Sequence, residues 1–154
     1  MSTATEKQAT ADRETVICHL QKAYSMELEA VANYLADSVN LDGVRAEEVK
    51  KSLGEEVEDE LGHARKLAAR IKQLEGHVPG PGQLEFEHSH LRATDRRTDV
   101  VDVIRAVIQD EQAAIDHYKT IIRETDGEDF VTQDLCIELL ADEEKHITLF
   151  NGFL

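Results

Sequence analysis

The stretch Glu60-Leu61-Gly62-His63 decides how this chain folds, because the same pattern returns as Glu143-Glu144-Lys145-His146. Each Glu-x-x-His stretch follows a single glutamate at nearly the same interval, Glu27 in the first half and Glu111 in the second. Residues three apart lie on one face of an α-helix, so each stretch presents a carboxylate beside an imidazole. The repeat predicts two similar helix pairs that together supply four carboxylates and two imidazoles.

The composition favours an all-α domain. The chain has 154 residues, no tryptophan and only two prolines, Pro79 and Pro81. The rest is rich in alanine, leucine, glutamate and lysine, which favour helices. This length gives one domain with a real core and makes a second domain unlikely. We predict a flexible N-terminal lead over residues 1–11 and a single four-helix-bundle domain over residues 12–154.

The charge of the chain excludes some partners. The net charge of −15 argues against nucleic-acid binding, which needs clustered lysine and arginine. There is no run of about 18 apolar residues and no apolar signal core between Met1 and Glu14. Cys18 and Cys136 form no Cys-x-x-Cys unit, so we expect two free thiols. These features predict a soluble, cytoplasmic protein without nucleic-acid or membrane partners.

The positions of Gly, Pro and capping residues predict four helices, at about residues 12–40, 44–75, 99–125 and 128–154. Asp12 is expected to cap the first helix. The connection between the second and third helices has roughly twenty residues, whereas bundle connections usually have about two to eight. It can span about 60 Å, so these two helices can run parallel. We predict a ferritin-like four-helix bundle, with two antiparallel hairpins joined by one long crossover.

The glutamates and histidines of the repeat occupy positions where a helix normally buries apolar side chains. The predicted inward stripes are Leu20, Tyr24, Glu27, Val31 and Tyr34 in the first helix, and Cys136, Leu139, Glu143, His146 and Phe150 in the fourth. Burying one unpaired carboxylate costs several kcal/mol. Two divalent cations would balance four carboxylates, and this oxygen-rich ligand set suits iron or manganese.

Two stretches resemble motifs of the bacterioferritins and related ferritin-like di-iron carboxylate proteins. They are Glu27-Leu28-Glu29-Ala30-Val31-Ala32-Asn33-Tyr34 and Asp142-Glu143-Glu144-Lys145-His146-Ile147. The likeness extends from about residue 15 to residue 154. It implies an iron storage or detoxification protein whose ferroxidase centre binds two Fe ions per subunit. Such a centre oxidises Fe(II) with O2 or H2O2 and passes Fe(III) to a mineral store.

The resemblance also implies roles for individual residues. The implied metal ligands are Glu27, Glu60, His63, Glu111, Glu143 and His146, with Glu60 and Glu143 bridging both ions. Tyr34 would lie beside the centre, although a core tyrosine is an equally good interpretation. Glu56 is expected on the inward face one turn before Glu60, either behind the metal ligands or as a ligand that transfers iron to the centre. Haem is not expected, because Leu61 stands where haem-binding relatives have a methionine.

Other functions stay open at this stage. The same ligands could serve a rubrerythrin-like peroxidase that stores no mineral, but such proteins usually carry a cysteine cluster and a further glutamate, where this chain has Ala114. A non-catalytic or purely structural bundle is the third interpretation. We expect a homo-oligomer, because apolar outer positions such as Ile17 and Leu28 indicate self-association. A dimer and shells of 12 or 24 subunits all stay open, since only eight residues follow His146 in this sequence and the short fifth helix of 24-subunit cages is not seen.

Overall fold

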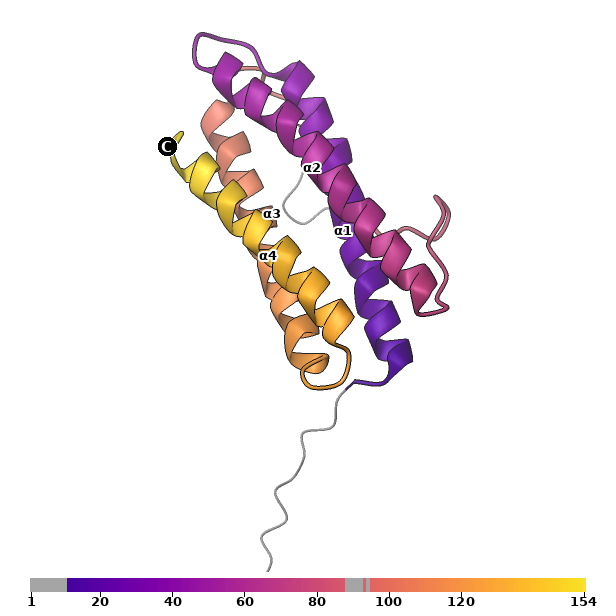
Figure 1. The fold of residues 1–154 in the computed structure, drawn as a ribbon. Coiled ribbons are helices and arrows are strands. Elements are labelled where there is room, and N and C mark those ends of the chain that lie inside the picture. Colours follow the sequence, from indigo (N-terminus) through magenta and orange to yellow (C-terminus); the bar gives the residue numbers. More distant parts are fainter. Residues whose placement is uncertain (1–10, 88–92, 94) are drawn as a thin grey trace, which may run out of the picture.

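The computed structural model describes residues 11–87, 93 and 95–154, and this part of the chain contains four α-helices (Figure 1). They are α1 (Arg13–Asn40), α2 (Ala46–Gln73), α3 (Val100–Glu124) and α4 (Phe130–Asn151). The prediction of an all-α four-helix bundle is confirmed. Residues 1–10, where the sequence predicts a flexible lead, lie outside the described residues. None of the described helices is long and apolar enough to cross a membrane.

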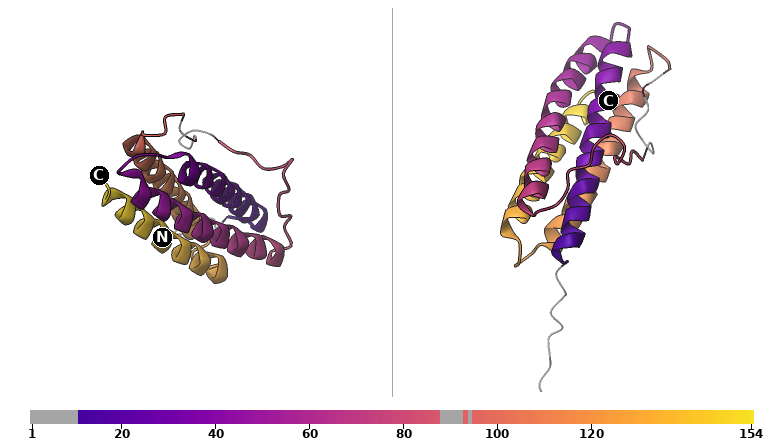
Figure 2. Two further views of the ribbon diagram at one scale, coloured as in Figure 1. Left: turned by 90° about the horizontal axis from the view of Figure 1, so that it is seen from above. Right: turned by 90° about the vertical axis from the view of Figure 1, so that its right-hand side faces the viewer.

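The helices form two antiparallel hairpins, α1 with α2 and α3 with α4 (Figure 1). The start of α3 lies at the same end of the bundle as the start of α2 (Figure 2), so α2 and α3 run in the same direction. This is the predicted topology. The hairpins meet mainly between α1 and α3, whereas α2 and α4 touch little.

The helix ends follow local chemistry. Asp12 accepts a hydrogen bond from the backbone N–H of Thr15 at 2.8 Å, which confirms the predicted cap. At the same end of the first hairpin, α2 stops at Gln73, and Glu75 takes a positive φ of 63°. Gly76 follows, and a Cβ atom at this position would lie 2.8 Å from the side chain of Ile17. A glycine therefore fits here without a clash. The end of α2 therefore packs closely against α1.

The crossover is fastened to α1 by three polar contacts. The side-chain amide of Gln21 donates to the carbonyl of His77 at 2.7 Å. Further along, Lys22 pairs with Glu87 at 3.3 Å, and the backbone N–H of Glu87 donates to Glu29 at 3.1 Å. These contacts hold residues 77–87 of the connection, which have no regular secondary structure, along α1.

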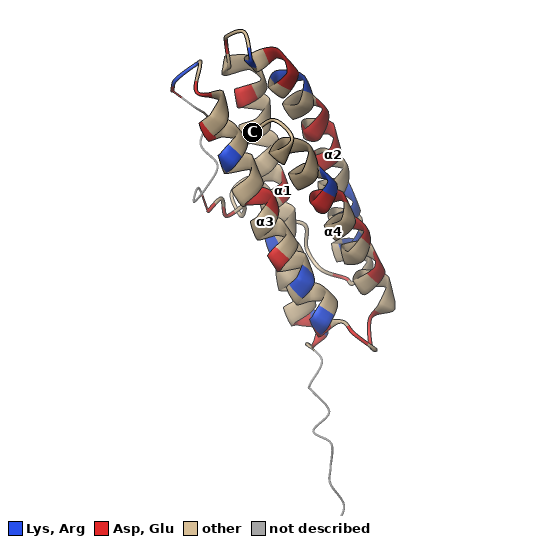
Figure 3. Ribbon diagram, turned by 90° about the vertical axis from the view of Figure 1, so that its left-hand side faces the viewer, with Lys and Arg blue, Asp and Glu red and all other residues tan. Residues whose placement is uncertain are grey.

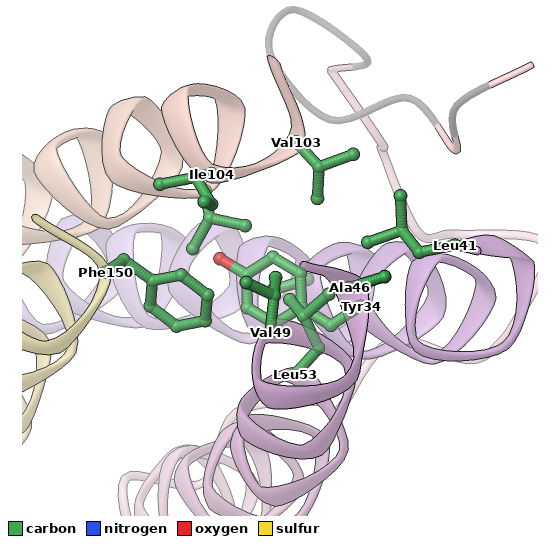
Figure 4. Packing of buried hydrophobic residues seen from close by; sticks show 10 residues of the cluster. Tyr34, Leu41, Ala46, Val49, Leu53, Val103, Ile104 and Phe150 are labelled. Atoms are coloured by element: carbon green, nitrogen blue, oxygen red, sulfur yellow. The ribbon is translucent and has the colours of Figure 1, made fainter. Parts of the chain in front are cut away.

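Two apolar clusters fill the interior. The first surrounds Tyr34 and Phe150 near the α1–α2 turn (Figure 4), and consists of Ala30, Tyr34, Leu41, Ala46, Val49, Leu53, Val103, Ile104, Val107 and Phe150. The second, near the α3–α4 turn, consists of Val16, Leu20, Ala23, Leu67, Ile71, Ala114, Tyr118, Ile121, Cys136 and Leu139. The helical segments between these clusters carry the repeated glutamates and histidines.

One detail of the predicted stripe on α1 is wrong. Ala23 and Ala30 are buried, whereas Tyr24 and Val31 are only partly buried. Both assignments fit helical spacing, and α1 packs against α2 and α3 at once. Small side chains therefore occupy the crowded side, and the larger ones lie at its margin.

Asp129 links the start of α4 to α2, and its loss should destabilise the bundle. Its carboxylate accepts the backbone N–H of Thr132 at 3.0 Å and pairs with Arg70 at 2.8 Å. We expect Asp129→Asn to lower the free energy of unfolding by about 1–2 kcal/mol in urea titrations at pH 7. Asp134→Asn, an exposed change on the same helix, should change it by less than about 0.5 kcal/mol.

This effect should depend on pH. Burial alone would raise the pKa of Asp129, but hydrogen bonds from Thr132 and the charge of Arg70 lower it below its usual value of 3.8. A lowered folded-state pKa gives stability that is present above the unfolded value and is lost as pH falls through the folded one. The difference between Asp129→Asn and the parent should therefore shrink below about pH 4. An undiminished difference at pH 2.5 would contradict this assignment.

Candidate metal centre

The six residues predicted as metal ligands come together between the two apolar clusters. They form two overlapping groups, in each of which the possible ligand atoms lie within 4.8 Å of one another. The first group is Glu27, Glu60, His63 and Glu143, and the second is Glu60, Glu111, Glu143 and His146. Every member is buried. Two adjacent groups that share two carboxylates have the form of a two-metal site.

Each helix contributes to this arrangement, and both imidazoles turn the same nitrogen inward. The Nδ1 atom of His63 lies 3.1 Å from Glu60 and 3.2 Å from Glu143. The Nδ1 atom of His146 lies 3.0 Å from Glu143 and 3.3 Å from Glu60. The two rings stack with centroids 6.0 Å apart. Two of these contacts, Glu60 with His63 and Glu143 with His146, join residues three apart on one helix, so they follow from helical spacing.

The centre concentrates negative charge in the interior. Burial, followed by repulsion from Glu27 and Glu111, raises the pKa of Glu60 and of Glu143 well above the usual value. Burial alone would lower the pKa of His63, but the nearby carboxylates of Glu143, Glu27 and Glu60 raise it. Protons or imidazolium ions therefore have to offset the buried charge in the absence of cations.

The pKa of Glu27 shifts in the opposite direction to those of Glu60 and Glu143. Burial would raise the pKa of Glu27, yet hydrogen bonds with His63, Glu60 and Tyr118 lower it. Glu27 is thus ionised more readily than the two shared carboxyl groups. The centre thus holds glutamates of two kinds, one whose pKa is lowered and two whose pKa is raised.

The polar atoms of the centre fit divalent cations. Within the described residues, one oxygen of Glu60, both oxygens of Glu143 and Nδ1 of His146 are buried without a hydrogen-bond partner. Such atoms are costly unless something satisfies them. Two divalent ions would do so, and four carboxylates would balance their charge. Carboxylate oxygens with some imidazole suit iron and manganese, and zinc can also bind.

Two tyrosines hold outer glutamates of the centre. The hydroxyl of Tyr34 donates to Glu111 at 2.7 Å. The hydroxyl of Tyr118 donates to Glu27. Tyr118 stands seven residues after Glu111, which puts both on the same helical face, but this spacing alone fits an ordinary core residue equally well. Each tyrosine connects α1 with α3.

Asp110 is a further, partly buried carboxyl group near the centre that the sequence did not reveal. It lies 3.4 Å from the hydroxyl of Tyr34. Burial, with the charges of Glu111, Glu27 and Glu29, raises the pKa of Asp110 to about 8. In the sequence it is simply one more acidic residue beside Glu111, so no pattern distinguishes it from a surface position.

The outward nitrogens of the two imidazoles also face carboxylates. The Nε2 atom of His146 lies 2.8 Å from Glu56 and 3.7 Å from Asp59, and these three residues form a third group of possible metal ligands. Glu56 is buried, and the sequence analysis expects it on the inward face of this helix. On the other side, Nε2 of His63 lies 3.4 Å from Asp142. The sequence motif contains Asp142, but nothing in its spacing indicated this contact.

The cysteines take no part in the centre. Cys18 is exposed, Cys136 is buried and neither forms a disulfide, as predicted. Burial raises the pKa of Cys136 to about 12, so this thiol stays protonated near neutral pH. The groups of possible metal ligands within the described residues include neither of them.

Known proteins are similar to this chain in sequence and in fold. Residues 17–154 match the ferritin family through its ferritin-like domain. The bacterioferritin of Desulfovibrio desulfuricans is 26% identical over 138 residues, which cover 89% of this chain and 73% of that protein. A match of this extent covers all four helices.

Solved structures agree with this result. A dodecameric thioferritin, the bacterioferritin-related protein of Bacteroides fragilis, superposes with a TM-score of 0.85 at 28% identity, covering 95% of this chain and 88% of that one. The bacterioferritin of Rhodobacter capsulatus gives 0.77 at 26% identity, covering 93% and 84%. A ferritin-like di-iron carboxylate protein of Bacillus anthracis shares the fold, with a TM-score of 0.80 at 22% identity, covering 94% and 99%. The chain therefore belongs to the ferritin family and is related to the bacterioferritins.

Proposed function

We propose that this protein is a ferroxidase that stores or detoxifies iron in the cytoplasm. Fe(II) would bind in pairs to the two overlapping groups and be oxidised there to Fe(III) by O2 or H2O2. The observation that carries the proposal is that Glu60 and Glu143 belong to both groups and are fully buried. Shared, buried carboxylates hold two cations close together and away from water, as two-metal chemistry requires.

The protein side chains would favour the oxidised product. Four carboxylates in a medium of low dielectric constant attract Fe(III) more strongly than Fe(II), so they lower the cost of oxidation. Each pair of Fe(II) ions gives up two electrons, which reduce one O2 to H2O2 or one H2O2 to two waters with uptake of two protons. Tyr34 and Tyr118 would keep Glu111 and Glu27 in place during this change.

Iron could reach the centre between α2 and α4. A pocket of about 470 Å³ lies between these helices, and both His63 and His146 line it. It also contains Glu56 and Asp59, whose carboxylates can pass a cation toward His146. The proposal includes no haem, because Leu61 offers no ligand to haem iron.

We further propose that the protein assembles into a homo-oligomeric shell. The Bacteroides fragilis relative is a dodecamer. Several large apolar side chains of the described residues are exposed here, among them Val39, Phe130 and Val131, each 60% exposed or more. Contacts between subunits would cover such side chains, since isolated chains gain nothing from exposing them.

Anaerobic loading with Fe(II) at increasing ratios, followed by air, tests the proposal when size-exclusion light scattering is run on the same sample. Rapid oxidation of two irons per chain, followed by uptake of many more into a large particle, is the expected result. Saturation at two irons on a dimer would replace it with a di-iron redox enzyme that stores no mineral. Failure to oxidise any iron would overturn it.

A further inference from the structure

We propose that a pocket between α1 and the crossover binds a small amino-acid thiol, which is held on Cys18 as a mixed disulfide. The pocket has a volume of about 360 Å³, and the six ligands of the proposed metal centre are not among the residues that line it. Sites for small molecules usually enclose about 300–1,000 Å³. The inference is independent of the proposed ferroxidase function.

One side of the pocket is a single face of α1. Cys18, Lys22 and Ser25 follow one another at intervals of four and three residues, so they lie on the same face of the helix, and all three line the pocket. Cys18 is exposed and forms no disulfide, so its thiol is open to reagents in solution. This face places a thiol, an ammonium group and a hydroxyl along one wall.

The opposite wall belongs to the crossover and is held by its own hydrogen bonds. The side-chain oxygen of Gln83 accepts the backbone N–H of Gly80 at 3.1 Å and lies 3.0 Å from Nε2 of His77. The carbonyl of His77 in turn accepts the side-chain amide of Gln21, on α1, at 2.7 Å. These contacts fix the wall beside the helix, so the pocket is formed before a ligand enters.

Ser25 is the observation that points to a polar ligand. It is only 6% exposed, and within the described residues its hydroxyl makes no hydrogen bond. Most buried polar side chains have a hydrogen-bond partner, because an unpaired one is costly. Since Ser25 lines the pocket, a ligand there can supply the missing partner.

Charges of both signs border the same space. Lys22 lies on the helix side, and Glu85 and Glu87 lie on the crossover side. Lys22 pairs with Glu87 at 3.3 Å, but their side chains are 51% and 57% exposed, and such a pair contributes little. Acidic and basic residues are also interspersed along α2 and α3 (Figure 3), so a mixed pair alone identifies no site. Here it accompanies a buried hydroxyl and an exposed thiol.

These groups together select a class of ligand. A carboxylate can pair with Lys22 and accept the hydroxyl of Ser25. An ammonium group can pair with Glu85 or Glu87, and a sulfur atom can bond to Cys18. Cysteine, and short peptides that contain it, carry all three groups on one small molecule.

The bond forms by thiol–disulfide exchange. The thiolate of Cys18 attacks one sulfur of the symmetrical disulfide of the ligand. A sulfur–sulfur bond to Cys18 replaces the bond between the two ligand sulfurs, and the other half of the ligand leaves as a thiolate, which takes up the proton that Cys18 lost. Cys18 is oxidised and one ligand sulfur is reduced, so no further oxidant is needed.

Cys136 is an internal control for this chemistry. It is buried in the second apolar cluster, and burial raises its pKa to about 12. Only a thiolate attacks a disulfide, so the folded protein should carry the adduct on Cys18 and not on Cys136. In urea both thiols are accessible, and exchange at Cys18 then gives the reference without a pocket.

Equilibration of the full-length protein with mixtures of cysteine and cystine at pH 8, followed by peptide mass spectrometry, tests the inference. The exchange constant of Cys18 should be about 10-fold larger in the folded protein than in urea. Ser25→Ala should lower the folded-state constant by about 3- to 10-fold, since one hydrogen bond is lost. Ser38→Ala should leave it unchanged, because the hydroxyl of Ser38 donates to Leu35 within the same helix. Circular dichroism confirms that the variants are folded.

Two simpler disulfides separate the charges, since cystamine carries only ammonium groups and dithiodipropionate only carboxylates. Lys22→Met should weaken exchange with cystine and with dithiodipropionate by about 2- to 5-fold at low salt, but not exchange with cystamine. Lys51→Met, an exposed change on α2, should weaken none of them. A larger constant for cystine than for glutathione disulfide assigns the pocket to a free amino acid, and the reverse assigns it to a peptide.

Three results would overturn the inference. The first is an equal exchange constant for Cys18 in the folded and unfolded protein, and the second is a parental constant in Ser25→Ala. The third is an equal effect of Lys22→Met on all three reagents. Each would make Cys18 an ordinary exposed thiol, whatever the protein does with iron.

Discussion

Replacing Glu60 and Glu143 together by glutamine is expected to slow Fe(II) oxidation by at least about 100-fold. Both glutamates belong to both groups of possible ligands, so the double change removes bridging charge from each metal position at once. Glutamine has nearly the same shape, which separates the loss of charge from the creation of a cavity. Stopped-flow measurement of Fe(III) formation after mixing with air-saturated buffer gives the rate.

A matched control uses the same chemical change on the same helices. Glu55 and Glu144 are exposed on α2 and α4, and their replacement by glutamine should leave the rate within about 2-fold of the parent.

The metal-free Glu60→Gln, Glu143→Gln protein should also be more stable than its parent at pH 8, because two costly buried charges are gone. A parental oxidation rate in this folded variant would refute the assignment of the centre.

Cation binding is expected to raise the melting temperature by about 10–20 °C when each metal position is exposed to 100 times its Kd. Binding at that excess contributes about 2.7 kcal/mol per position. In a chain of this size, each kcal/mol raises the melting temperature by about 2–4 °C. The cations replace the protons and imidazolium ions that otherwise offset the buried carboxylates.

The stability of the metal-free protein should also fall as pH rises. Folding raises the pKa of Glu60 and Glu143, through burial and neighbouring charges, and of His63 and His146, where hydrogen bonds to carboxylates outweigh burial. The native state therefore binds more protons than the unfolded state, which makes stability decrease with pH. The lowered pKa of Glu27 has the opposite effect on the pH dependence of stability, but it is one group, and the four groups with raised pKa values outnumber it.

The pH range over which stability declines follows from the usual pKa values of these groups. The carboxyl groups begin to reduce stability above 4.5, and the contribution of the imidazoles is complete below 6.5 and declines above it. Thermal melts followed by circular dichroism at pH 5 and pH 8, with and without Zn²⁺, measure the effect. Zn²⁺ should raise the melting temperature more at pH 8 than at pH 5. At both pH values it should raise the melting temperature of the Glu60→Gln, Glu143→Gln protein less than that of the parent. An equal increase at both pH values would contradict the proton linkage.

Much of this protein could be predicted from local patterns. The spacing of apolar residues, the capping Asp12 and the long segment after Gly76 predict four helices in two hairpins, because helical periodicity and caps depend on residues close in the chain. The inward position of the repeated glutamates and histidines follows from the same periodicity. The ends of the helices differ from the predictions by at most three residues, since the last turn depends on packing such as that of Gly76 against Ile17.

Other features of the centre depend on side chains from different helices, which no spacing along the chain brings together. Tyr118 holds Glu27 across 91 positions of sequence, and His63 meets Asp142 across 79. In the sequence these residues look like an ordinary core tyrosine and an ordinary acidic residue. The sequence alone determined which residues each helix turns inward, because that is a property of one helix. Only the tertiary structure decided which of them touch, because contact depends on how the two hairpins pack.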